Sequence, residues 1–170
     1  SDIRMSRNNF FACDVGIWVV NSKSVAIGVN NFSNSSGIGA AIKLSTDTAS
    51  ETAGMISGAT ISNNSFWAQR TSLNFSGSAS NVIYSNNVHV DCLDIPLAGN
   101  GISPHHRYKI TGNSFHLANN FGTGPTTYSR TEAPLRLEGA QMFNSEICDN
   151  KVDANGLNTV THFANDQTAA

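Results

Sequence analysis

The sequence predicts an all-β fold: a right-handed, single-stranded parallel β-helix, that is, a solenoid of about six coils. Two observations predict it. A six-residue motif built around one asparagine recurs six times, and a short run with apolar residues two positions apart follows five of the copies. Apolar residues two apart indicate strands, and no segment shows a sustained helical period. A unit this short cannot bury its own apolar face, so successive units must stack around a shared core.

The motif consists of a large apolar residue, two variable residues, Asn, one variable residue, and then Phe or Val. Its copies span residues 5–10, 27–32, 61–66, 83–88, 110–115 and 147–152. They begin 22, 34, 22, 27 and 37 residues apart, so the shortest interval predicts the bare unit and the longer ones predict inserted loops.

Stacking in register would place the motif's asparagines at one inward corner, where each amide can bond its neighbours and the turn backbone. The predicted ladder is Asn8, Asn30, Asn64, Asn86, Asn113 and Asn150. The motif's last residues would form an adjoining apolar stack of Phe10, Phe32, Phe66, Val88, Phe115 and Val152.

The second strand of each unit is predicted from its paired apolar residues, which are Ile17/Val19, Ile42/Leu44, Leu73/Phe75, Leu93/Ile95 and Leu135/Leu137. If these pairs point inward, the residue between them points outward. The outward row is then Trp18, Lys43, Asn74, Asp94 and Arg136. An aromatic ring can stack on sugars while the polar groups bind hydroxyls and acidic substituents, so the row is a candidate glycan-binding strip. The alternative is a solvated sheet face with an Asp94–Arg136 ion pair.

Composition narrows the classes of function. The chain has 170 residues, the length of one domain, and we treat residues 1–170 as a single β-helix domain. A net charge of −2 with 13% charged residues argues against nucleic acid, and no apolar run is long enough for membrane insertion. The spacing of Cys13, Cys92 and Cys148 fits no zinc motif and predicts reduced thiols. We expect neither a metal nor a cofactor.

The repeated Ile-x-x-Asn-x-Phe motif resembles the right-handed parallel β-helices of the pectate-lyase-like superfamily, over residues 3 to about 163. The superfamily includes pectinases, polysaccharide lyases, epimerases and bacteriophage tailspikes. No catalytic motif of these enzymes is present. The absence of a signal peptide and of a disulfide framework favours a tailspike. The resemblance then implies a homotrimer in a virion tail, extracellular when it acts, that binds a bacterial surface polysaccharide; such tailspikes often cleave the glycan as well, and whether this chain does so stays open. The motif starts at once, so we expect a piece of a longer chain.

Glycan hydrolysis needs two carboxylates, one protonated and one ionised. The predicted catalytic candidates are Asp91, Asp94 and Glu132. Further candidates for substrate binding are Tyr128 and Arg130, in a long insertion between Phe115 and Pro134, and the cluster of His105, His106 and Arg107. This cluster, with His89 and His116 nearby, could instead supply the base of a lyase, which we consider less favoured.

Two other functions stay open at this stage. One is a non-enzymatic structural or adhesive β-helix, which would cleave nothing. The other is a secreted polysaccharide lyase or epimerase. The sequence does not specify the sugar, the bond or the host.

Overall fold

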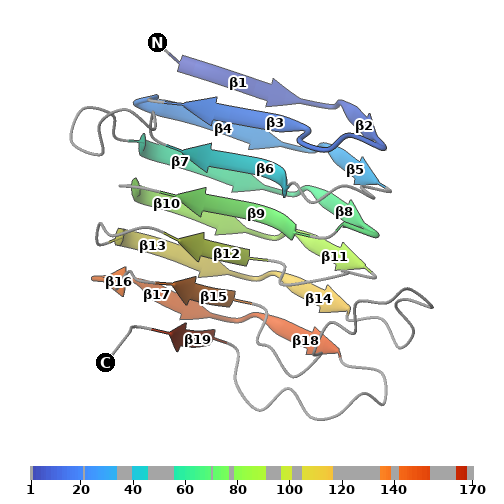
Figure 1. Cartoon of the computed structure of the whole chain (residues 1–170). Helices are drawn as coiled ribbons and strands as arrows, with labels where there is room; N and C mark the ends of the chain where they lie inside the picture. Colours follow the sequence, from blue (N-terminus) through green and yellow to red (C-terminus); the bar gives the residue numbers. More distant parts are fainter. Residues whose placement is uncertain are drawn as a thin grey trace.

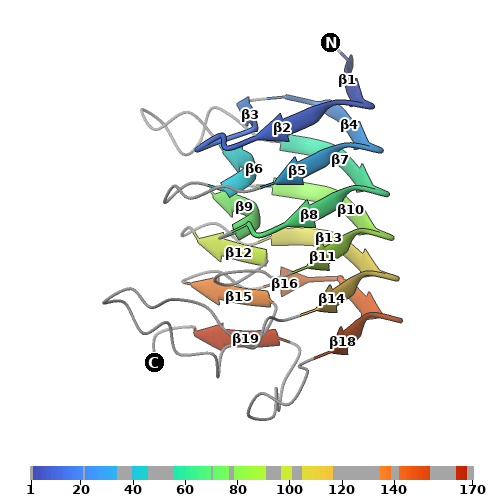
Figure 2. The same cartoon turned by 90° about the vertical axis from the view of Figure 1, so that its right-hand side faces the viewer.

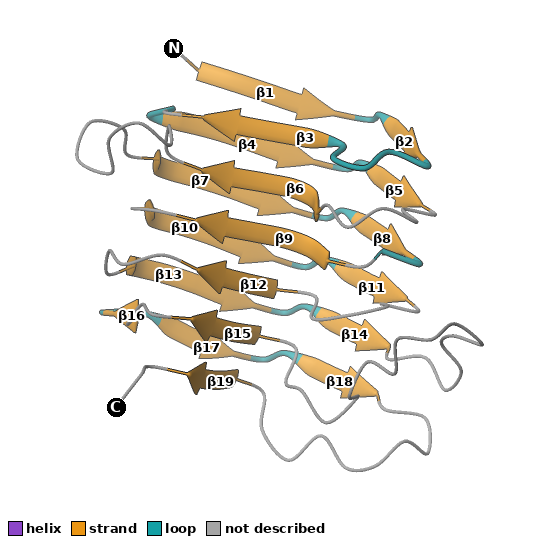
Figure 3. Ribbon diagram, viewed as in Figure 1, coloured by secondary structure: helices purple, strands orange, loops and turns teal. Residues whose placement is uncertain are grey.

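The computed structural model describes residues 2–20, 22–33, 40–45, 56–69, 71–76, 79–90, 97–100, 105–116, 135–138, 142–153 and 164–167. The regular elements in these ranges are the strands β1 to β19, and no helix occurs among them (Figure 3). The same ranges therefore contain no helix that could cross a membrane. The predicted all-β class is confirmed.

The strands form three sheets in which every pairing is parallel. Sheet A contains β1 Asp2–Ser6, β4 Ser24–Gly28, β7 Ile56–Ser62, β10 Ala79–Ser85, β13 His105–Thr111, β16 Met142–Phe143 and β17 Glu146–Cys148. Sheet B contains β2 Asn9–Phe11, β5 Asn31–Ser33, β8 Ser65–Trp67, β11 Val88–Val90, β14 Ser114–His116 and β18 Lys151–Asp153. Sheet C contains β3 Ile17–Val20, β6 Ala40–Ser45, β9 Thr71–Ser76, β12 Leu97–Asn100, β15 Leu135–Glu138 and β19 Ala164–Gln167.

The chain visits the sheets in the same order each time, first A, then B, then C. We call each such set of strands a repeat: β1–β2–β3 is the first and β16/β17–β18–β19 the sixth. Corresponding strands of consecutive repeats lie side by side, in tiers that run from the N-terminus to the C-terminus (Figures 1 and 2). Like residues of successive repeats are therefore register partners.

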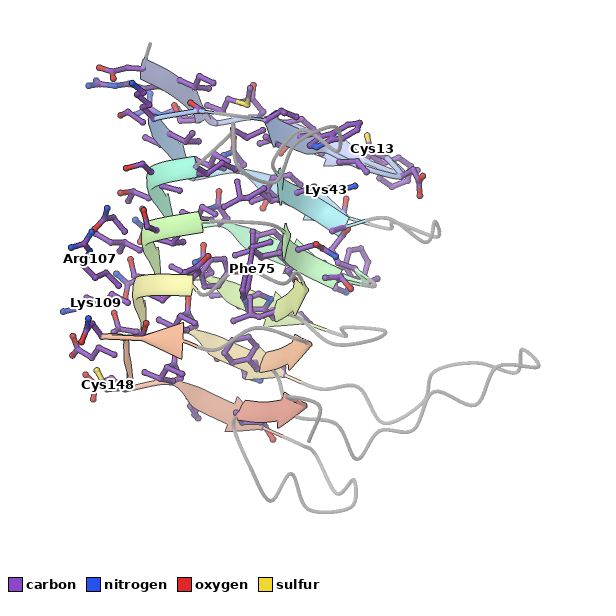
Figure 4. All side chains as sticks on the ribbon, turned by 60° about the vertical axis from the view of Figure 1, so that its left-hand side comes forward. Cys13, Lys43, Phe75, Arg107, Lys109 and Cys148 are labelled. Atoms are coloured by element: carbon purple, nitrogen blue, oxygen red, sulfur yellow. The ribbon has the colours of Figure 1, made fainter. Side chains whose placement is uncertain are left out.

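Alternate residues of the strands point inward and share one hydrophobic cluster drawn from all three sheets. In β3, for example, Ile17 and Val19 are buried while Trp18 and Val20 are exposed. Phe75 lies in the interior between the sheets (Figure 4). Burial of these side chains is the main term that stabilises the stack, because no single repeat has a core of its own.

The asparagine ladder follows sheet A in every repeat. Each amide oxygen accepts from both the backbone N–H and the side-chain amide of the asparagine one repeat earlier; between Asn30 and Asn64 these distances are 3.0 and 3.1 Å. The ladder consists of Asn8, Asn30, Asn64, Asn87, Asn113 and Asn150. The prediction of Asn86 is wrong by one position, because Tyr84 and not Ile83 pairs with Ile61. Asn87 is fully buried, whereas Asn86 is exposed.

The residue before each ladder asparagine has a left-handed backbone, which turns the chain from sheet A into sheet B. Their φ angles run from 54° to 67°, and the residues are Arg7, Val29, Asn63, Asn86, Gly112 and Asp149. Asn86 belongs to this column. Asparagine tolerates the left-handed region, so an Asn-Asn pair suits both positions and conceals which one faces inward.

The aromatic stack lies two residues after the ladder, in sheet B. Phe10, Phe32 and Phe66 stack with ring centroids 4.8 and 5.0 Å apart and nearly parallel planes. In the fourth repeat the stack continues through His89, not Val88, which is 41% exposed. The same one-residue shift that moved the ladder to Asn87 explains this correction. Phe115 and Val152 occupy the following positions.

The strand of sheet C in the fourth repeat also differs from the prediction. Leu97 pairs with Leu73 and with Leu135, so β12 holds Leu97 and Gly99 where Leu93 and Ile95 were expected. Gly99 interrupts the apolar alternation, and the Leu93/Ile95 pair offered a better period-two pattern in the sequence. Leu93 and Ile95 lie outside the described residues.

Candidate functional site

The outer face of sheet C carries the predicted row, with one substitution. The register partners along it are Trp18, Lys43, Asn74, Ala98, Arg136 and Asn165. The position predicted for Asp94 is therefore occupied by Ala98, and the proposed Asp94–Arg136 pairing across adjacent strands is wrong. The structure thus brings together Trp18, Lys43 and Asn74 and gives Arg136 a place in the same row.

Trp18 and Lys43 make the best-defined contact on this face. The indole of Trp18 is 61% exposed, and the Lys43 Nζ lies 4.7 Å from the centroid of its ring. Because the two residues are direct register partners, the strand pairing holds the cation near the π-face. An apolar plane beside an ammonium group can stack on a sugar ring and bind one of its hydroxyl or acidic oxygens.

Asn74 follows Lys43 in the row and is half-buried. Its side-chain oxygen is buried, and no described residue donates a hydrogen bond to it. A buried acceptor without a donor is costly, so this oxygen weakens the packing under the row and is not itself open to a molecule on the surface.

The three predicted catalytic carboxylates, Asp91, Asp94 and Glu132, lie outside the described residues, as do Tyr128 and Arg130. Within the described part of the chain, no group of three or more His, Cys, Asp or Glu side chains could hold a metal ion.

The predicted basic cluster lies on a different sheet. His105, His106 and Arg107 belong to β13 of sheet A, where His105 and His106 pair with Met142 and Phe143. Arg107 is exposed with a φ of 57° and projects on the side of the molecule away from Lys43 (Figure 4). The cluster is therefore separate from the row on sheet C.

His89, expected near the lyase cluster, and Tyr108, which follows Arg107 in β13, are both buried in the core. His89 is fully buried, and burial lowers the pKa of its ring to about 3, so the imidazole is neutral. Its two ring nitrogens lie 2.8 Å from the Ser72 hydroxyl and 3.0 Å from the Tyr84 hydroxyl. Burial also raises the pKa of Tyr108 well above its usual value. Neither His89 nor Tyr108 can reach a glycan outside the sheets, so the structure assigns them to packing.

Sequence reasoning missed a groove on the outer face of sheet B. It has a volume of about 560 Å³ and lies between the exposed rings of Phe11 and Trp67. The signal was present in the motif: the residue after each inward aromatic must point outward, and that residue is Phe11 after Phe10 and Trp67 after Phe66.

Comparisons with protein families, with curated proteins and with solved structures return no match for this chain.

Proposed function

We propose that the chain is a segment of a right-handed parallel β-helix that binds a polysaccharide along the outer face of sheet C. The regular A–B–C order of parallel strands and the continuous asparagine ladder support the β-helix. The observation that carries the binding proposal is the exposed Trp18 indole with the Lys43 ammonium 4.7 Å from its centroid.

The row has the chemistry that a sugar chain needs. The Trp18 ring offers apolar surface to the C–H face of a pyranose, and Lys43 offers a donor beside it. Asn74, half-buried, follows Lys43 in the row. These three side chains come from consecutive strands about 4.8 Å apart, so a polymer lying across the strands meets each in turn.

The proposal extends to a tailspike-like protein of a bacteriophage, a homotrimer that acts outside the cell on a bacterial capsule or O-antigen. This extension rests on the resemblance of the motif to tailspike β-helices. If the protein also cleaves its glycan, hydrolysis by Asp91, Asp94 and Glu132 is the proposed chemistry, and elimination is the less favoured alternative.

Binding is tested with Trp18→Ala against a panel of purified bacterial capsular and O-antigen polysaccharides, by isothermal titration calorimetry. The affinity of the polysaccharide that binds should fall by about tenfold or more, because an exposed aromatic anchor is removed. Ile83→Ala is the matched control, since Ile83 is 41% exposed on the outer face of sheet A. Equal losses in both variants, or no loss in Trp18→Ala, would contradict the proposal.

Cleavage is tested separately by incubating the wild-type protein with the bound polysaccharide and sizing the products. Release of oligosaccharides at an unchanged rate by the triple variant Asp91→Ala, Asp94→Ala, Glu132→Ala would eliminate the carboxylate mechanism. Sedimentation of the protein at increasing concentration tests the trimer.

A further inference from the structure

We infer that the groove on the outer face of sheet B is a second glycan site, which takes an uncharged, extended segment of a sugar chain. Its walls are Phe11 of β2 and Trp67 of β8, 68% and 55% exposed. Ser33 of β5 is the register partner of both and lies between them. The groove is separate from the row on sheet C, and no residue is shared between the two.

The spacing of the groove follows from the strand register. Phe11, Ser33 and Trp67 stand on three consecutive strands, so the two rings are two strand steps apart, roughly 10 Å. Serine is the small member of this column. The space above it is open because no ring of the second repeat fills it, and a hexose fits between flanking aromatic side chains in such a space.

Polar side chains lie beside the rings in the neighbouring outward column. They belong to Asn9, Asn31 and Ser65, which are also register partners. Within the described part of the chain, no side-chain hydrogen bond occupies the amides of Asn9 and Asn31 or the hydroxyls of Ser33 and Ser65. Amides and hydroxyls next to aromatic rings match a ligand that alternates apolar C–H faces with hydroxyl groups.

The charge distribution selects the kind of glycan. The outward residues of β2, β5, β8 and β11 include no charged side chain; on the described part of sheet B, outward ionisable groups begin with His116 of β14 and continue with Lys151 and Asp153 of β18. Sheet A, in contrast, presents Arg4, Lys109 and Glu146 to solvent. An acidic polymer would find no counter-charge in the groove, so a neutral segment is the occupant that fits.

The groove is also rigid before any ligand binds. The Phe10–Phe32–Phe66 stack lies directly behind it, and the ladder of Asn8, Asn30 and Asn64 fixes the turns that lead into β2, β5 and β8. A preformed site loses little conformational entropy on binding. A second copy of the chain is the competing occupant, but the interleaved serines and asparagines break the apolar surface that a protein partner would bury.

The test uses cellohexaose, mannohexaose, xylohexaose and a dextran as neutral probes and oligogalacturonate as the acidic one. The chain has two tryptophans, Trp18 and Trp67, so in a Trp18→Phe background the emission reports Trp67 alone. At least one neutral probe should shift this emission in a saturable manner, and oligogalacturonate should not. Absence of a response to every neutral probe, or a response to the acidic probe alone, overturns the inference.

Variants in the otherwise wild-type protein locate the site. Trp67→Ala and Phe11→Ala should each lower the affinity for the neutral glycan by about tenfold or more, as measured by calorimetry. Ser33→Phe should block binding as strongly, although it adds aromatic surface, because it fills the space between the two rings. Val88→Ala is the matched control, since Val88 is exposed on the same sheet face but does not line the groove.

The outcomes separate this site from the one on sheet C. The inference is supported if Trp67→Ala and Ser33→Phe lose affinity for the neutral glycan while Val88→Ala keeps it. This holds whether or not Trp18→Ala weakens the polysaccharide proposed to bind on sheet C. Unchanged affinity in Trp67→Ala overturns it. A dimer in sedimentation that Trp67→Ala dissociates would show that a second copy covers the groove, and would also overturn it.

Discussion

Asn87→Ala tests the register of the ladder, because the neighbouring Asn86 was the residue expected from the sequence. The Asn87 side chain makes four hydrogen bonds. Its oxygen accepts from the backbone N–H of Asn64 at 2.9 Å and from the Asn64 amide at 3.1 Å. Its amide donates to the Ile61 carbonyl at 3.0 Å and to the Asn113 oxygen at 3.1 Å. All four partner groups lose a contact in the interior, because Asn87 is fully buried.

The cost can be estimated group by group. After truncation, the Asn64 amide keeps its bonds to the carbonyls of Ile27 and Ser62, and the Asn113 oxygen keeps the backbone N–H of residue 87. The Asn64 N–H and the Ile61 carbonyl lose a partner in the interior. Two such groups at about 1–3 kcal/mol each give an expected loss of about 2–6 kcal/mol in the free energy of unfolding.

Asn86 provides the matched control one residue away. It is exposed with a φ of 54°, so Asn86→Gly should change stability by less than about 0.5 kcal/mol, and Asn86→Ala should cost on the order of 1 kcal/mol for its left-handed backbone. Urea unfolding followed by circular dichroism gives the free energies if the transition is single. If the repeats unfold in steps, hydrogen exchange at the backbone N–H of Asn64 reports the local loss of stability. A larger effect of Asn86→Ala than of Asn87→Ala would refute the register.

Three further predictions concern single side chains. The pKa of His89 is about 3 in the fold, below its usual 6.5, so only the unfolded chain takes up this proton as the pH falls below 6.5. His89 should thus remove about 2 kcal/mol of stability by about pH 5, and His89→Phe should flatten the pH profile in that range. Val29 has a φ of 59°, which strains a β-branched residue, and it is 58% exposed. Val29→Asn should therefore raise the free energy of unfolding in urea by about 1 kcal/mol, and a lower free energy of unfolding would contradict backbone strain at this position. The Cys148 thiol donates a hydrogen bond to the Glu146 carboxylate, which is the largest of the causes that raise the pKa of the thiol to about 11, so iodoacetamide should alkylate Cys148 several-fold faster in Glu146→Gln, as measured by peptide mass spectrometry. An unchanged rate would contradict this effect.

The inward residues of the fold were predictable because the stack forces them to repeat. Asn30 and Phe32 recur as Asn64 and Phe66 with the same internal spacing, and the motif placed both in register. The fourth repeat misled the prediction where its residues depart from the pattern. Tyr84 and His89 replace the usual Ile and Phe, and the shifted frame of Ile83, Asn86 and Val88 matched the motif better than the true one.

The outward residues were less predictable, because solvent imposes no periodic chemistry on them. Trp18, Lys43 and Asn74 were found since each lies between two inward apolar residues. Ala98 was not found, because it lies between Leu97 and Gly99, and glycine at the second flanking position breaks the apolar alternation. The segments that carry Asp91 and Glu132 follow no repeat in the sequence, and added loop length costs little free energy, so nothing in the pattern fixes where those carboxylates lie.

Separation of the two candidate sites follows from the same architecture. Phe11 and Trp18 belong to one repeat but to different sheets, and the ladder and the aromatic stack fix each strand without reference to its outward side chains. The outer faces of sheets B and C can therefore carry different chemistry at little cost to the core. A cation and an aromatic ring meet on sheet C, while only uncharged groups line the groove on sheet B. Truncations at Trp18 and Trp67 should consequently be additive in stability and independent in binding, since the two exposed rings stand on the outer faces of different sheets.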